Sequence, residues 1–94
     1  MTEKNHQALE ASFVTLAMSV ASSALMSLGL APDPQTKKTS VNIDLARFNI
    51  DLLDMLERKT KGNLAKEEQD FMNQVLADLK YKFVEVSGHG NKKV

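Results

Sequence analysis

Three aspartates on one predicted helix are the residues whose type and spacing come closest to acid–base chemistry. Asp44, Asp51 and Asp54 fall on one side of that helix. Arg47 and Arg58 stand three or four positions from them, which is the spacing of ion pairs on a helix surface. A charged face toward solvent accounts for the whole pattern. We therefore predict no catalytic residue and no enzymatic activity.

Metal and nucleophile chemistry find little support in the residue types. His6 and His89 are the two histidines, they stand near opposite ends of the 94 residues, and neither has a partner at metal-ligand spacing. The chain has no cysteine, so it offers no thiolate as a ligand or nucleophile. We predict neither a metal nor a cofactor.

A basic cluster surrounds the predicted turn between the second and third helices. It consists of Arg58, Lys59, Lys61 and Lys66. These cations could contact a phosphate or an acidic partner, and they could equally complement the negative end of a helix dipole. Over the whole chain 12 basic residues balance 12 acidic ones, so nucleic acid is not an expected partner.

The apolar periodicity predicts an all-α chain of three helices, with the second and third forming a hairpin, in one domain over residues 1–94. The predicted segments are helices at about 7–28, 43–60 and 66–86, a polar loop at 31–41 and a flexible tail at 87–94. Gly29 and Gly62 are expected to end the first two helices in the left-handed conformation. Asn42 is expected to cap the start of the second helix.

The segment from Ala11 to Pro32 has no charged residue and is long enough to cross a bilayer. Its six hydroxyl residues, and the lack of Trp or Tyr at its ends, argue against a membrane span and favour a core helix. Upstream, Glu3 and Glu10 outweigh Lys4, which is unlike the start of a secretion signal. We expect a cytoplasmic protein.

The first two helices are apolar over more of their circumference than two neighbouring helices can cover. We therefore predict a homo-oligomer, a dimer or higher, most simply with two-fold symmetry. The predicted self-association face lies on the first helix and comprises Ser12, Thr15, Ser19, Ser22, Ser23 and Met26. A groove for another protein's helix is one alternative, and a monomer covered by its own terminal segments is another. A different class of function is a small helical bundle that binds an apolar small molecule or lipid between the first two helices.

Three stretches carry a resemblance to a known family. They are "SLGLAPDP" at 27–34, "IDLLDMLERKTKGNL" at 50–64 and the basic end of the third helix, "LADLKYKFVE". The chain resembles, from about Phe13 to Glu85, a family of short bacterial proteins described as domain of unknown function 1844. The resemblance implies a helical fold, no established activity and no catalytic residues to transfer.

The start of the third helix departs from that family's pattern. The family usually places Thr-Pro before an acidic pair at the start of the third helix, whereas here Ala65 and Lys66 precede Glu67 and Glu68. Losing such a cap costs about 1 kcal/mol. Asn63 is then an alternative cap for this helix.

Overall fold

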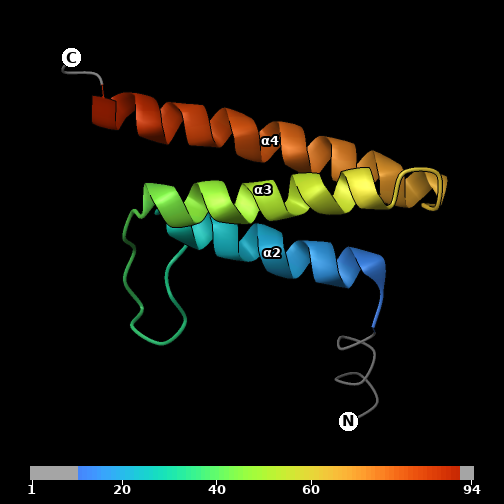
Figure 1. The fold of residues 1–94 in the computed structure, drawn as a ribbon. Helices are drawn as coiled ribbons and strands as arrows, with labels where there is room; N and C mark the ends of the chain where they lie inside the picture. The colour runs from blue at the N-terminus through green and yellow to red at the C-terminus, as the bar shows by residue number, and fades with distance from the viewer. Residues whose placement is uncertain (1–10, 92–94) are drawn as a thin grey trace, which may run out of the picture.

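The computed structural model describes residues 11–91 of the chain, and the side chains of residues 11–88. It has three helices, α2 (Phe13–Ser27), α3 (Ile43–Lys59) and α4 (Lys66–Asn91). They run alternately in opposite directions with α3 between α2 and α4, and α2 also contacts α4 (Figure 1). Residues 11–91 contain no strand, so the predicted all-α three-helix fold is confirmed.

Local side-chain chemistry sets where the helices begin. Asn42 Oδ1 accepts the Leu45 N–H at 3.1 Å, which confirms the predicted cap of α3. The prediction that the first helix already includes residues 11–12 is wrong, because Ser12 Oγ accepts the Thr15 N–H at 3.1 Å and so caps α2 just before Phe13. The predicted helical residues 7–10 lie outside the described part.

The start of α4 keeps half of a capping box. Lys66 is its first residue, and the Glu68 carboxylate accepts the Ala65 N–H at 2.8 Å. The alanine side chain cannot return a hydrogen bond. Asn63, the alternative cap, stands two residues before Ala65 and therefore does not cap α4. Its N–H donates to Thr60 O at 2.8 Å.

The ends of the helices agree with the sequence for α2 and α3 and differ for α4. Gly29 (φ 76°) and Gly62 (φ 85°) both have the predicted left-handed conformation. Residues 87–91 continue α4 where a flexible tail was predicted, because partly buried Val86 still packs against the core and the Ser87 hydroxyl donates to Phe83 O at 2.8 Å. Residues 92–94 of that tail lie outside the described part.

Small side chains bring α2 and α3 together. The buried apolar residues are Ala17, Ala21, Ala24, Leu28, Ala46, Ile50, Leu53, Met72, Leu76 and Leu79. Four of these ten are alanines, and all four lie on α2 and α3, where short side chains let two helix backbones approach closely. The larger side chains of α4 then cover one side of this pair.

A buried polar pair fixes how α2 and α3 align. The Asn49 Nδ2 group donates to Ser27 Oγ at 3.4 Å, and the Ser27 hydroxyl donates to Ser23 O at 2.8 Å. Both residues are buried, and a sliding movement of one helix would leave their polar groups without partners. This pair therefore specifies the register in which the antiparallel helices pack.

Candidate functional site

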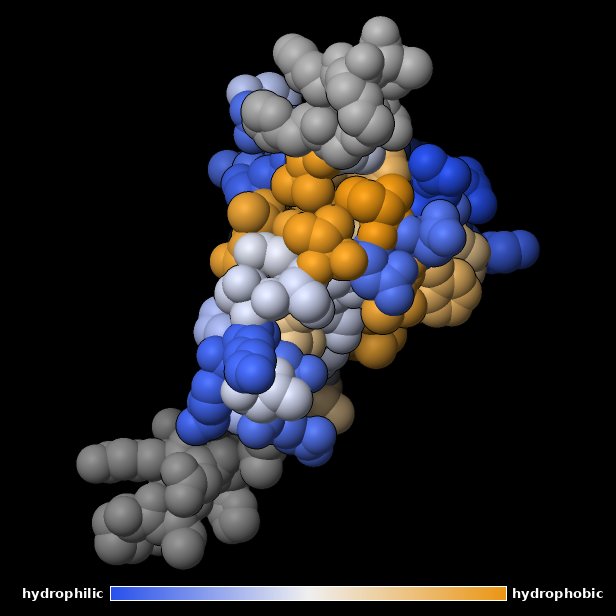
Figure 2. All heavy atoms as spheres, turned by 90° about the vertical axis from the view of Figure 1, so that its left-hand side faces the viewer, coloured by the Kyte–Doolittle hydropathy of each residue, from blue (hydrophilic) through white to orange (hydrophobic). Residues whose placement is uncertain are grey.

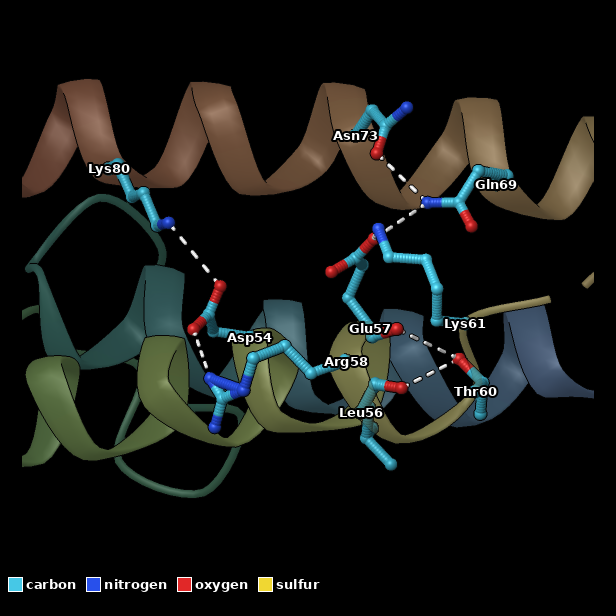
Figure 3. A network of polar contacts seen from close by, with 9 residues as sticks. All are labelled: Asp54, Leu56, Glu57, Arg58, Thr60, Lys61, Gln69, Asn73 and Lys80. Atoms are coloured by element: carbon cyan, nitrogen blue, oxygen red, sulfur yellow. Dashed lines mark hydrogen bonds and ion pairs between the residues drawn. The ribbon is translucent and has the colours of Figure 1, made fainter.

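Of the three aspartates on α3, Asp54 is held in ion pairs (Figure 3). Asp54 accepts from Arg58 at 2.7 Å and from Lys80 of α4 at 3.5 Å. The predicted pairing of Arg47 with Asp44 and Asp51 is wrong. Instead, the Arg47 guanidinium lies 5.3 Å from the centre of the Phe83 ring, where the face of the ring attracts the cation.

Glu57 ties α3 to the start of α4. Its carboxylate accepts from Lys61 Nζ at 2.6 Å and from Gln69 Nε2 at 3.0 Å, as Figure 3 shows, and only 12% of its side chain is exposed. The hydrogen bond from Lys61, followed by that from Gln69, lowers the pKa of Glu57 below its ordinary value of 4.5. A carboxyl group with a lowered pKa is ionised at neutral pH, which suits an ion pair and not a proton donor.

The basic cluster at the turn is mostly paired within the chain. Arg58 forms an ion pair with Asp54, and Lys61 forms one with Glu57. Lys66 forms an ion pair with Asp70 at 3.0 Å. The exposed Lys59 has no ion-pair partner among the residues that the structure describes. Three of the four cations therefore already have an acidic partner within the chain.

The described residues bear on two further expectations, those about a metal site and a membrane span. Among these residues, no group of three or more His, Cys, Asp or Glu side chains is placed to hold a metal ion. His6 and the side chain of His89 lie outside them. No helix within the same part of the chain is long and apolar enough to cross a membrane. The cytoplasmic location expected from the sequence stays a prediction.

The predicted self-association face on α2 is exposed at four of its six residues. Ser12, Thr15, Ser19 and Ser22 are exposed, and the Ser12 hydroxyl also donates to Thr15 Oγ1 at 2.9 Å. The other two members, Ser23 and Met26, are partly buried and line a hollow together with Leu45 and Asn49 of α3. One edge of the predicted face therefore borders α3.

A row of larger apolar side chains lies along α3 beside that edge. This α3 strip consists of Leu45, Phe48, Leu52 and Met55. Leu45 is 46% exposed and Phe48 is 55% exposed, while Leu52 and Met55 are partly buried. The buried face of α3 uses Ala46, Asn49, Ile50 and Leu53, so the strip points away from the core.

Sequence reasoning did not single out this strip. It found α3 apolar over most of its surface but assigned the contact face to the hydroxyl residues of α2. The available signal was the alternating spacing of three, four and three positions from Leu45 to Met55, which is the spacing of a helix–helix seam.

Two hollows bear on the alternative of an apolar ligand. The hollow between α2, α3 and their connecting loop is lined mainly by polar residues, among them Ser27, Asp33 and Lys38. A hollow between α3 and α4 is lined by three apolar residues and three charged ones, which are Ile50, Phe83, Val84, Arg47, Asp51 and Lys80.

The molecule also has a partly apolar end. Figure 2 looks at the end with the connecting loop and shows apolar side chains gathered between that polar loop and the C-terminal part of α4. Among the exposed apolar residues, Leu30, Val41 and Val84 belong to these segments. Each of these three residues is at least half exposed, so together they give this end an apolar surface. An apolar ligand between α2 and α3 stays a prediction.

Comparison with protein families settles what the sequence motifs indicated. Residues 10–85 match the family described as Domain of unknown function (DUF1844). The chain belongs to this family. The match covers most of the 94 residues, including all of α2, all of α3 and most of α4. Comparisons with curated proteins and with solved structures find no match.

Proposed function

We propose that this DUF1844 protein is a homo-oligomeric interaction module that acts by binding and not by catalysis. The observation that carries this proposal is the α3 strip, whose Leu45 and Phe48 remain about half exposed on a folded chain. Contiguous apolar surface of this kind usually marks a contact with another protein surface. The predicted self-association face of α2 borders the strip, and its hydroxyl side chains are small enough to let a second copy approach.

The size of the strip indicates a moderate affinity. Complete burial of one Leu or Phe side chain contributes about 1.5–3 kcal/mol. Because Leu45 and Phe48 are only about half exposed, each gains roughly half of that amount, and a two-fold contact gains it in both copies. Association itself costs on the order of 4–15 kcal/mol. We therefore expect a dimer that forms at micromolar concentrations.

Light scattering over a concentration series tests the proposal. The parent should approach at least twice the monomer mass at micromolar concentrations, and Phe48→Glu should stay monomeric because each copy would place a charge in the apolar contact. Met18→Glu is the matched control, since Met18 is 53% exposed on the side of α2 away from the strip. A parent mass that stays at the monomer value on concentration would refute the proposal.

A further inference from the structure

We propose that two copies of this chain pack with their α3 helices antiparallel. The two-fold axis that relates them passes between the two Leu52 side chains. This inference rests on the proposed self-association and specifies its partner surface, which is the same surface on a second copy. It is carried by the spacing of the α3 strip, by two charges at its ends and by the row of α2 that lies beside it.

The spacing of the strip makes it complementary to itself when reversed. Leu52 stands near the middle, with Phe48 four residues before it and Met55 three residues after it. An antiparallel second copy therefore brings its own Leu52 opposite Leu52 and its Met55 opposite Phe48. A flexible methionine opposite each phenylalanine fills the space beside the rigid ring.

Charges at the two ends select the antiparallel direction. Asp44 lies in the first turn of α3 and Lys59 is its last residue. Both are exposed, and neither has an ion-pair partner within residues 11–88. Antiparallel packing places Asp44 beside Lys59 of the second copy at both ends of the contact. Parallel packing would instead place like charges beside each other, which is unfavourable.

A matching row on α2 lies on the same side of the molecule. Leu16, Ser19, Ser23 and Met26 repeat the spacing of three, four and three positions found in the strip. Ser23 and Met26 share a hollow with Leu45, so this α2 row runs next to the strip.

The alignment of α2 with α3 allows a single two-fold axis to relate both the α3 strip and the α2 row to those of the second copy. Asn49 donates to Ser27, and α2 runs antiparallel to α3. Ser23, one turn before Ser27, is therefore level with the residues one turn after Asn49, where Leu52 lies. The small serines of the α2 row then leave room for the α2 helix of the second copy.

Single cysteines test the pairing, since the natural chain has none. On oxidation of the full chain, Leu52→Cys should form a disulfide-linked dimer because the two thiols meet at the axis. Phe48→Cys should not, because identical positions would be offset by seven residues, about 10 Å along the helix. That offset exceeds the Cα separation of about 4–7 Å that a disulfide spans. An equimolar mixture of Phe48→Cys and Met55→Cys should yield the mixed disulfide.

Charge reversal gives a second measurement on the same dimer. Asp44→Lys alone should raise the dimer dissociation constant by about tenfold, because two exposed ion pairs are replaced by like charges. The double variant Asp44→Lys, Lys59→Asp should restore it. A dimer that cross-links through Phe48→Cys alone but not through Leu52→Cys would overturn the pairing and leave self-association standing. A monomeric parent would overturn both.

Discussion

At the scale of single residues, two glycines with the same conformation have different surroundings. Gly29 and Gly62 both have positive φ, which costs a residue with a side chain about 1–2 kcal/mol. A Cβ at Gly62 would meet no atom within 4 Å. A Cβ at Gly29 would come within 2.8 Å of Val41 Cγ2 and 3.3 Å of Ser40 O. The first glycine therefore also permits the loop to return closely onto the end of α2.

Alanine at each position separates these two contributions. Gly62→Ala should destabilise by about 1 kcal/mol through conformation alone, a fall of roughly 4–8 °C in melting temperature for a domain of this size. Gly29→Ala should melt lower still, because Val41 or the loop must also move. Gly62→Asn is the control, since asparagine tolerates this conformation better. Equal melting temperatures for the two alanine variants would show that the close approach at Gly29 costs nothing.

At the scale of the helices, the sequence predicted the start of α3 and the left-handed glycines after α2 and α3, but it missed the start of α2, where Ser12 caps the helix. Asn42 and the two glycines act within about one helical turn of their own positions, so the sequence alone was sufficient there. The end of α4 depends on packing, because Val86 contacts a core that only the folded chain provides. Gly88 lies in open space, since a Cβ there would meet no atom within 4 Å. Packing at Gly88 itself therefore does not explain why α4 continues past this residue.

The close contact of α2 with α3 gives a prediction at this scale. Ala24 is fully buried, so Ala24→Leu would force three extra carbon atoms between the two helices. We expect a loss of about 1–3 kcal/mol in the free energy of unfolding. Ala77→Leu is the matched control, because Ala77 is exposed on α4. Alanine and leucine are both good helix formers, so this exchange should cost little there. Denaturant unfolding of both variants measures the difference, and similar midpoints would mean that α2 and α3 have room to separate.

At the scale of the whole molecule, the three helices leave the α3 strip and the α2 row beside it partly exposed. The sequence predicted that a second copy would be needed, because it showed two helices with broad apolar surfaces. It did not predict which surface remains, since that depends on the angle at which α4 lies across α3. The structure places the α3 strip and the edge of the predicted α2 face next to each other. Ser23 and Met26 border the strip, whereas Ser22 points about 100° away from Ser23 around the helix.

Two serines of α2 therefore serve as a matched pair. Ser19 and Ser22 are both exposed and lie within one turn of each other, but only Ser19 belongs to the α2 row beside the strip. Arginine is a better helix former than serine, so neither Ser19→Arg nor Ser22→Arg should destabilise the isolated chain. Ser19→Arg should weaken the dimer, because a long cation would enter a contact between small side chains. Ser22→Arg should leave the dimer unchanged.

The measurement combines a sizing column with thermal melts at several protein concentrations. Dimerisation stabilises the folded chain by mass action, so the melting temperature of the parent should rise with concentration. For Ser22→Arg the same rise is expected, whereas Ser19→Arg should elute later and melt at a temperature that depends less on concentration. Should Ser19→Arg elute and melt like the parent at every concentration, the α2 row would face solvent in the oligomer, and the contact would rest on α3 alone.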